Sequence, residues 1–530
     1  MAGPAVSHVL ARRLGRLVLC VGTAAALAAS APAEAKGPAG APPPELLVTV
    51  AIGPASTLRG LQAYVEAVKP NTGALVSEPI IRHQLAAAAG VPSLDGLDAG
   101  SWTYVLVSDH NSSMAITVAG KVRDAKALTA AVGADHLTIK DGWAVVGERA
   151  NVDRDAAFAL ATLVTQPAPK QLTATVYLPQ LLARYQQQLH QVRNQVASSM
   201  PRSSAQMATI VNAYVDGIAS LGADTDKLIV TLDAAADLGS LDVALVPRAG
   251  SRLAQFVAAQ KPTDYALLGK LPPLQPSMVM AGGIDLGPYH DGMLQTMAAF
   301  LDPTGSKEVL AALEQLRKTM TGEVAFTLQM APGAGLQMAQ LFGTSDAKVA
   351  DASLASMLAL FRTGRSFEVQ GAKTTIQSTA TPTTYDGVTI RGYDTTMDLT
   401  KAEPAQRQMA TLMGSDKPVH AQVAAFDKLA MVVATKDSQA DAHRAIDTAR
   451  GKAAAYAPSP EIKAQLDASR ARKDSMAMVF DVGKLVAAFL PAATLGNLPV
   501  VISLGTADKQ AHLRFVLPAS LLRGLASLRP

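Results

Sequence analysis

The sequence predicts an α+β protein with two pseudo-symmetric halves, each an antiparallel sheet of β-hairpins with helices packed on one face. Strand pairs and helices alternate along the chain with short connections, which is typical of antiparallel sheets covered by helices. Five segments of the first half also have counterparts, in the same order, in the second half. With 530 residues, 49% hydrophobic and 17% charged, the chain is globular in composition and long enough for more than one domain.

The five repeated segments define the expected elements in order. The first is a strand entering a helix, at 47–68 and again at 278–300, and the second is a hairpin whose copies, Gly100–Lys126 and Gly322–Lys348, align without a gap. Each copy of that hairpin ends in Asp-Ala-Lys, where Asp124 and Asp346 are expected to cap the next helix. The other three pairs are a hairpin and helix at 137–156 and 419–442, a strand entering a helix at 174–177 and 477–480, and a closing hairpin and helix at 228–256 and 500–522. An internal duplication therefore organises the chain into residues 46–262 and 263–530.

Insertions distinguish the two halves. The first half carries an expected helical pair at 181–197 and 205–218. The second carries a helix at 307–320 and an extra hairpin that turns at Asp386-Gly387.

Residues 1–35 read as a signal peptide. Three arginines precede the apolar stretch Leu17–Ala29, and Ala33-Glu34-Ala35 fits the small-x-small rule, so cleavage is expected after Ala35; Ala26-Leu27-Ala28 offers a second position. Residues 36–45 form a Pro/Gly-rich leader. We expect the product to be secreted or periplasmic, and soluble after cleavage.

Removal of the signal peptide also decides the cysteine content and the charge. Cys20, the single cysteine, leaves with the signal; Leu19 occupies a position that should be small in a lipoprotein signal, so a cleavable signal is favoured. Three arginines and Glu34 leave with it, so the formal net charge falls from +4 to +2. Such a near-neutral chain without a basic block is not expected to bind nucleic acid.

The apolar run Leu485–Ala507 is long enough to span a bilayer. Pro491, Gly496, Asn497 and Pro499 divide it into a helix end, a loop and a strand. We therefore expect the core of a soluble domain and no transmembrane span after signal removal.

Motifs for metal and cofactor sites are missing from the sequence. No two histidines have helical ligand spacing, and neither a P-loop nor a dinucleotide-binding glycine motif is present. We expect no metal site and no cofactor site.

Ser345 and Lys348 are the candidate catalytic residues, because they form the Ser-x-x-Lys pair in which an amine activates a serine hydroxyl. The companion motifs Ser-Asp-Asn and Lys-Thr-Gly are absent, and Arg123 occupies the position of Ser345 in the other copy. A helix-capping role explains both copies, so this interpretation assigns no catalytic residue.

Methionines are frequent in the second half, at Met278, Met280, Met293, Met297, Met320, Met330 and Met338. Methionine packs ordinary cores and also lines adaptable hydrophobic grooves. The aromatic-poor composition, 4%, favours a core role.

The order of these modules resembles a group of uncharacterised exported bacterial proteins, a domain-of-unknown-function family whose chains alternate strand pairs and helices in two related halves behind a signal peptide. The resemblance implies no activity and no catalytic residues. The leading hypothesis is an exported, non-catalytic envelope protein that acts by binding or scaffolding, with an unknown envelope protein or a small hydrophobic ligand as partner. The alternatives are a periplasmic carrier of a hydrophobic or lipid ligand, and a serine hydrolase that uses Ser345 and Lys348.

Overall fold

The computed structural model describes residues 42–110, 113–165, 170–199, 217, 219–274, 276–289, 307–331, 335–369, 372–379, 381–402, 404, 407, 410, 418–489 and 499–527. Several predicted features lie outside these residues: Cys20, the cleavage site at Ala35, most of the leader, Met293 and Met297. The predicted helix at 205–218 also lies outside them, apart from Gly217. The chain forms two compact units. Unit 1 contains the described residues within 1–194, 220–248 and 516–530, and unit 2 those within 195–219 and 249–515.

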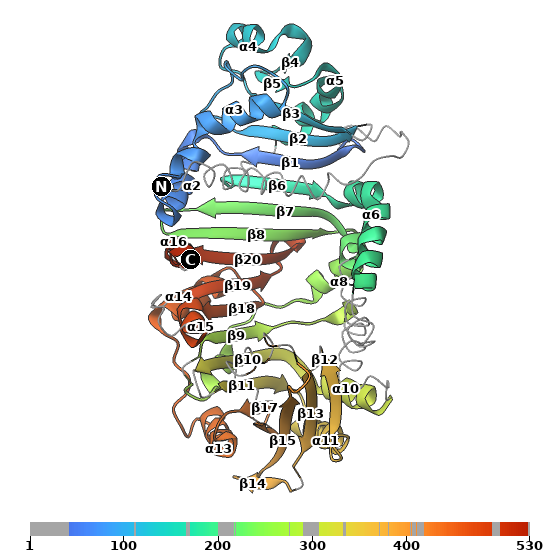
Figure 1. Ribbon diagram of the computed structural model, residues 1–530, viewed down its shortest axis with the longest axis vertical. Coiled ribbons are helices and arrows are strands. Elements are labelled where there is room, and N and C mark those ends of the chain that lie inside the picture. The colour runs from blue at the N-terminus through green and yellow to red at the C-terminus, as the bar shows by residue number, and fades with distance from the viewer. Residues whose placement is uncertain are drawn as a thin grey trace. The chain divides into compact units, whose positions relative to one another are not determined.

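Unit 1 is built on an antiparallel sheet with the strand order β4-β5-β3-β2-β1-β6-β7-β8 (Figure 1). The strands are β1 (Leu46–Ile52), β2 (Thr103–His110), β3 (Ser113–Lys121), β4 (Leu137–Lys140), β5 (Trp143–Val146), β6 (Leu172–Tyr177), β7 (Thr225–Ala234) and β8 (Leu238–Pro247). The helices are α2 (Ala55–Val68), α3 (Glu78–Ala88), α4 (Ala125–Val132), α5 (Arg149–Phe158), α6 (Leu178–Ser199) and α16 (Ala519–Ser527), with the short η1 (Gly73–Val76), η2 (Ala134–His136) and η3 (Ala159–Leu163).

Helices cover both faces of this sheet, so the prediction of helices on one face was wrong for unit 1. Successive side chains of a strand point to opposite faces. Val50 and Ile52 pack in a core cluster with Leu58 of α2, whereas Ala51 packs in another cluster with Val152 of α5. All seven residues of β1 are buried as a consequence. The strand is apolar except for Thr49 and does not alternate between apolar and polar residues, which is typical of a strand buried on both faces.

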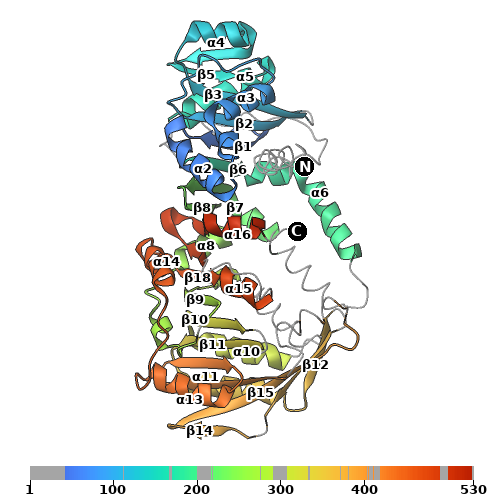
Figure 2. The same ribbon diagram turned by 60° about the vertical axis from the view of Figure 1, so that its left-hand side comes forward.

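Unit 2 contains a longer sheet with the order β12-β13-β15-β16-β17-β11-β10-β9-β18-β19-β20, and β14 pairs with β15. The strands are β9 (Met278–Gly283), β10 (Met320–Ala331), β11 (Gly335–Thr344), β12 (Arg365–Val369), β13 (Ala372–Ser378), β14 (Thr383–Tyr385), β15 (Val388–Asp398), β16 (Val419–Phe426), β17 (Leu429–Ala434), β18 (Met476–Asp481), β19 (Pro499–Gly505) and β20 (Ala511–Pro518), of which the last belongs to unit 2 as far as Phe515. The helices are α8 (Arg252–Ala259), α10 (Lys307–Thr319), α11 (Ala347–Ala359), α13 (Ser438–Ala449), α14 (Pro460–Ala471) and α15 (Val482–Phe489), with the short η4 (Ala266–Lys270), η5 (Gly287–Tyr289) and η6 (Ala507–Lys509). Helices α11 and α13 both pack on β16 and β17 (Figure 2).

Two predicted turns are confirmed. Asp141 and Gly142 have φ angles of 53° and 77° and join Lys140 to its partner Trp143. Asp386 and Gly387, with φ angles of 49° and 74°, close the predicted extra hairpin. Two consecutive positive φ angles are the geometry of a two-residue hairpin, in which Asp-Gly is a preferred pair.

The late apolar run is also described in part. It contains the end of α15 and then β19, and Pro491, Gly496 and Asn497 between them lie outside the described residues. No helix in the described part of the chain is long and apolar enough to cross a membrane.

The last helix of the chain belongs to unit 1. The Tyr64 hydroxyl of α2 donates a hydrogen bond to the Leu517 carbonyl at 3.0 Å, and Arg523 Nε donates to the Ala67 carbonyl at 2.6 Å. Ala519 is buried in the core cluster that contains the apolar side of α2. Conversely, α8 belongs to unit 2, where it packs on η5. The units therefore differ from the predicted halves, 46–262 and 263–530, in the placement of these two helices and of the described residues within 195–219, which include the end of α6 and belong to unit 2.

Candidate functional site

A tight turn after α2 places α3 beside the sheet of unit 1. The Glu66 carboxylate accepts hydrogen bonds from the backbone N–H groups of Asn71 at 2.8 Å, Thr72 at 3.1 Å and Gly73 at 2.9 Å. These bonds favour the charged carboxylate and hold the pKa of Glu66 below its ordinary value of 4.5. The Thr72 hydroxyl adds bonds to the carbonyls of Val65 and Lys69, and η1 and α3 follow this turn.

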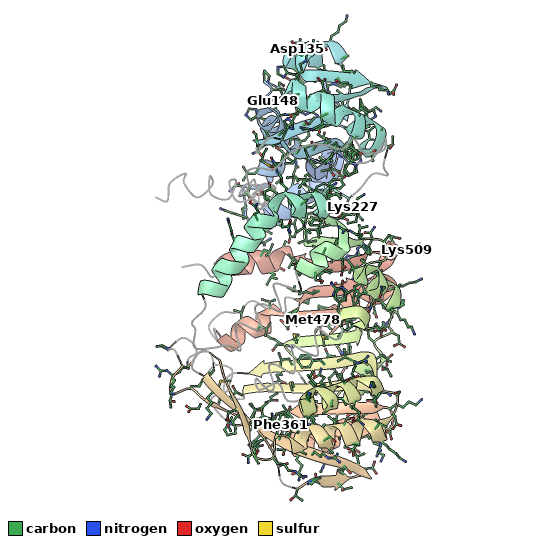
Figure 3. The ribbon with its side chains drawn as sticks, turned by 90° about the vertical axis from the view of Figure 1, so that its right-hand side faces the viewer. Asp135, Glu148, Lys227, Phe361, Met478 and Lys509 are labelled. Atoms are coloured by element: carbon green, nitrogen blue, oxygen red, sulfur yellow. The ribbon has the colours of Figure 1, made fainter. Side chains whose placement is uncertain are left out.

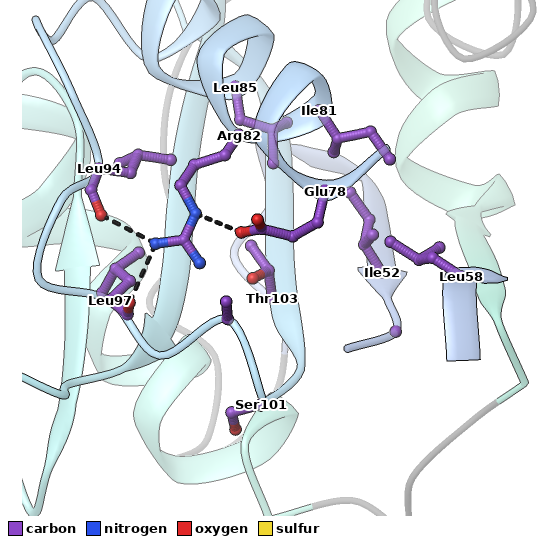
Figure 4. A pocket seen from close by; sticks show the side chains of 12 residues that line it. Ile52, Leu58, Glu78, Ile81, Arg82, Leu85, Leu94, Leu97, Ser101 and Thr103 are labelled. Carbon is purple, nitrogen blue, oxygen red and sulfur yellow. Dashed lines mark hydrogen bonds and ion pairs between the residues drawn. The ribbon is translucent and has the colours of Figure 1, made fainter. Parts of the chain in front are cut away.

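An ion pair on the first turns of α3 fixes the next loop. Glu78 and Arg82 are four residues apart and face each other, with Arg82 Nε donating to Glu78 Oε1 at 2.6 Å. The Nη1 group of the same guanidinium donates to the carbonyls of Leu94 at 3.2 Å and Leu97 at 3.0 Å (Figure 4). The side chains of Glu78 and Arg82 are only 22% and 19% exposed. One half-buried arginine thus ties α3 to the loop that leads into β2.

A small pocket of about 20 Å³ lies between α3, this loop and the adjacent ends of β1 and β2. Its apolar wall consists of Ile52, Leu58, Ile81, Leu85, Leu94 and Leu97, and its polar side chains are Glu78, Arg82, Ser101 and Thr103 (Figure 4). Gly53 completes the lining at a close approach of the backbone, because a Cβ there would lie 2.2 Å from Thr57 Oγ1. The pocket therefore joins an aliphatic wall to a few polar side chains.

A wider hollow of about 370 Å³ continues from this pocket. The two share Glu78, Arg82, Leu94, Leu97 and Ala99 in their linings. The wider hollow adds the exposed polar side chains of His83, Asp95 and Arg123, so its surface is charged where the smaller pocket is apolar.

The smaller pocket combines one cation, one carboxylate and two hydroxyl groups. Arg82 is the one cation among its described lining residues, and a guanidinium keeps its proton in proteins. It cannot serve as a general base for the hydroxyl of Ser101 or Thr103. The arrangement offers hydrogen-bond donors and acceptors beside an aliphatic wall, and its loop is already held in place.

Ser345 and Lys348, the candidate catalytic residues, lie in unit 2 in a helix cap. The Ser345 hydroxyl donates to the Thr319 carbonyl at 3.1 Å, and Asp346 Oδ1 accepts from the backbone N–H groups of Lys348 at 2.9 Å and Val349 at 3.1 Å. Ser345 and Lys348 are both exposed, and no hydrogen bond joins them among the described residues. The hydrolase stays a prediction that these contacts do not support.

The cap itself is confirmed in both copies. Asp124 Oδ1 accepts from the backbone N–H groups of Lys126 and Ala127, each at 3.0 Å, as Asp346 does in unit 2. A carboxylate at this position satisfies N–H groups that a helix leaves unpaired at its start.

The described residues contain no group of three or more side chains that could hold a metal ion. Asp109 and His136, each of which is next to a residue of the other type in the chain, have other partners. Asp109 accepts from Arg184 at 2.7 Å and 2.9 Å, and His136 Nδ1 lies 3.0 Å from the Gly147 carbonyl.

Unit 2 presents a second feature, which we call the methionine face. On β9, Met280 lies opposite Met478 of β18 and Phe326 of β10, and Met278 lies opposite Phe480 and Leu328. The face continues to β19 and β11, and its half-buried members are Met278, Met280, Phe326, Leu328, Met338, Met478 (Figure 3), Phe480 and Ile502. The alternate residues Val279 and Ala281 point to the opposite face and are buried. Three of the methionines noted in the sequence thus share one surface.

The Glu78–Arg82 spacing and the proline at the start of α3 were readable in the sequence, but the sequence analysis did not select them. Their partners at positions 94–103 come together with them only in three dimensions, and no spacing rule connects the two segments.

Comparisons with known proteins add no family. No protein-family model matches the sequence, and no curated protein matches it. A solved structure titled "Structure of crystal form III of TP0453" is similar at 10% identity and a TM-score of 0.24, over 51% of this chain and 100% of that chain. A likeness at this level carries no argument about fold or function.

Proposed function

We propose that this protein is an exported, non-catalytic envelope protein that acts by binding, and that the pocket beside α3 is its binding site. The observation that carries the proposal is the use of Arg82, which holds Glu78 and two loop carbonyls at once. A site that is already formed loses less conformational entropy when a ligand binds. The proposed export rests on the pattern of residues 1–35, and the resemblance to exported proteins of a domain-of-unknown-function family is part of the same proposal.

The proposal includes an internal duplication, which the order of the strands supports. The order β4-β5-β3-β2-β1-β6-β7-β8 in unit 1 corresponds, strand by strand, to β16-β17-β11-β10-β9-β18-β19-β20 in unit 2. Lys121 pairs with Trp143 in unit 1, and Gly343 pairs with Leu429 in unit 2. The sequence alignment equates these two pairs.

A pocket-filling variant tests the binding site. Ala99 lines both hollows, so Ala99→Trp should fill them, whereas Ala87→Trp places the same side chain on the exposed part of α3. Native mass spectrometry after incubation with small molecules extracted from the cell envelope should show a ligand on the wild type and on Ala87→Trp, and none on Ala99→Trp. A ligand retained by Ala99→Trp, or absent from the wild type, would contradict the proposal.

Carriage of a hydrophobic ligand is a second candidate function, and the methionine face favours it. Flexible thioether side chains adapt to apolar ligands of irregular shape. A fluorescent fatty acid should bind the wild type and Met114→Gln, a variant of an exposed methionine on β3, but should bind the Met280→Gln/Met478→Gln double variant at least tenfold more weakly. Equal binding to all three proteins would reject this role.

A further inference from the structure

We propose that the wider hollow beside α3 binds a neutral saccharide, whose hydroxyl groups pair with the guanidinium of Arg123 and the carboxylate of Asp95. This inference rests on the proposed function, because the hollow continues the pocket that is taken there as the binding site. Its volume of about 370 Å³ lies at the lower end of the range of small-molecule sites, which suits a mono- or disaccharide.

The loop at 94–97, which forms one wall of the hollow, is held from two sides. Arg82 of α3 donates hydrogen bonds to two of its carbonyls. On the other side, the backbone N–H of Arg123 donates to the Gly96 carbonyl at 2.8 Å. Gly96 has a φ angle of 102°, which residues with a Cβ rarely adopt. The backbone therefore places Arg123 next to the loop segment that carries Asp95, before any ligand binds.

The polar groups of this lining have hydrogen-bonding capacity that the protein does not use. No hydrogen bond or ion pair in the described part of the chain involves the side chains of Asp95, Arg123 or His83. A guanidinium has five N–H donors, a carboxylate has two acceptor oxygens, and an imidazole can donate or accept. A sugar hydroxyl both donates and accepts, so adjacent hydroxyl groups can meet both kinds of partner. The lining therefore complements a ligand that carries several hydroxyl groups.

The signs of the charges favour an uncharged ligand. Glu78 and Arg82 already face each other at an Oε1–Nε distance of 2.6 Å, and Asp95 and Arg123 carry opposite charges. An anion that approaches Arg123 also meets the charge of Asp95, and an ammonium group that approaches Asp95 also meets the charge of Arg123. A neutral sugar experiences neither repulsion.

The apolar part of the lining is limited to small groups. Pro79 and Pro92 are exposed, whereas Ala86, Leu94 and Leu97 are only 2%, 1% and 2% exposed. The described lining residues include no aromatic side chain. Two proline rings can contact the C–H groups of a sugar ring, but they do not enclose an acyl chain or a large apolar side chain.

The preference for neutral sugars is tested by isothermal titration calorimetry of the full-length protein. The probes are glucose, galactose, mannose and their disaccharides, each compared with the corresponding uronic acid and amino sugar, and glycine serves as a small zwitterion. We expect at least one neutral sugar to bind at least tenfold more tightly than its charged forms and than glycine. Its affinity should change less than twofold when NaCl rises from about 0.05 M to about 0.5 M, because salt screens only charged contacts.

A free sugar and one unit of a glycan chain share this chemistry, and the methyl glycoside of the sugar that binds separates them. Equal affinity of the glycoside indicates a glycan unit, and a large loss indicates a free sugar; both results support a saccharide. Failure of every neutral sugar to bind, or tighter binding of a charged form or of glycine, overturns the inference.

Two substitutions at exposed positions test the contacts. Arg123→Gln should weaken binding of the neutral sugar at least tenfold without weakening the amino sugar, because the repulsive charge is gone. Asp95→Asn should likewise weaken the neutral sugar, but not the uronic acid. Arg59→Gln, which alters an exposed arginine of α2 outside the lining, should change none of these affinities. Thermal melting checks that each variant keeps its fold, and equal effects of Arg123→Gln and Arg59→Gln would overturn the assignment.

The outcomes separate this inference from the proposed function. If no saccharide binds but Ala99→Trp abolishes binding of an envelope ligand, the site remains and its ligand belongs to another chemical class. If a saccharide binds and Ala99→Trp leaves its affinity unchanged, both proposals fail. Loss of saccharide binding in both Arg123→Gln and Ala99→Trp supports both.

Discussion

Removing one side chain from the last helix of the chain should weaken unit 1, which is otherwise built mainly from the first 250 residues. Leu522 of α16 is half-buried and packs against the core cluster that contains Leu58 and Leu61 of α2. Truncating a fully buried leucine to alanine costs about 2–5 kcal/mol, so Leu522→Ala should cost about 2 kcal/mol, at the lower end of this range.

The two tryptophans make the effect measurable in the full-length protein. Trp102 and Trp143 both lie in unit 1, so tryptophan fluorescence follows the unfolding of that unit. With a urea dependence of about 2 kcal/mol per M, a loss of about 2 kcal/mol lowers the midpoint by about 1 M. Ser520→Ala, an exposed position on the same helix, is the control and should shift the midpoint by less than about 0.25 M, since surface substitutions usually change stability by about 0.5 kcal/mol or less. Indistinguishable midpoints for the two variants would refute the assignment of α16 to the core of unit 1.

Three further changes test the contacts described above. Asp109→Asn removes the charge that Arg184 faces and leaves the guanidinium partly buried without its partner. Urea unfolding should therefore show a free energy of unfolding lower by about 3 kcal/mol, and an unchanged midpoint would contradict this. Asp124→Ala should cost about 1 kcal/mol by tryptophan fluorescence, and Asp346→Ala about 1 kcal/mol by circular dichroism, because both tryptophans lie in unit 1 and Asp346 lies in unit 2. Asparagine at either position should restore most of the loss, and equal losses for alanine and asparagine would argue against capping. Glu66→Gln should have a lower melting temperature than the wild type at pH 7, and the difference should disappear as the pH falls below 4.5. The reason is that the lowered pKa of Glu66 stabilises the folded state above that pH, and this contribution is lost when the carboxylate is protonated. A gap that is constant between pH 3 and pH 7 would mean that the carboxylate charge does not hold the turn.

Local features of the fold were accessible from the sequence because they depend on residues close together in the chain. The turn at 141–142 requires two consecutive positive φ angles, which an Asp-Gly pair adopts readily. Asp346 caps its helix through the backbone N–H groups of residues two and three positions later in the chain. The prediction of an α+β protein with antiparallel strands is confirmed, since it follows from hairpins and helices of this kind.

Features that depend on distant segments were not accessible. The pocket joins α3 to residues 94–103 and to the end of β1, and its binding character comes from one arginine that reaches two carbonyls of a loop. The placement of α8 in unit 2 and of α16 in unit 1 likewise follows from packing, since both helices have similar sequence patterns. The frequency of methionine in the second half was visible in the sequence. The pairing of Met280 with Met478 was not, because it depends on the register of strands that lie about 200 residues apart.

The contact between α16 and α2 also determines when unit 1 can be completed. The Tyr64 hydroxyl and the Ala67 carbonyl have their partners at Leu517 and Arg523, so these bonds cannot form until residue 523 has been synthesised. Until then α2 lacks the part of its packing that α16 supplies. For a chain that we propose is exported, such a delay is useful, because a polypeptide that has not finished folding can still be threaded through a membrane. A chain truncated before Ala519 would lack these contacts in the unit that is synthesised first.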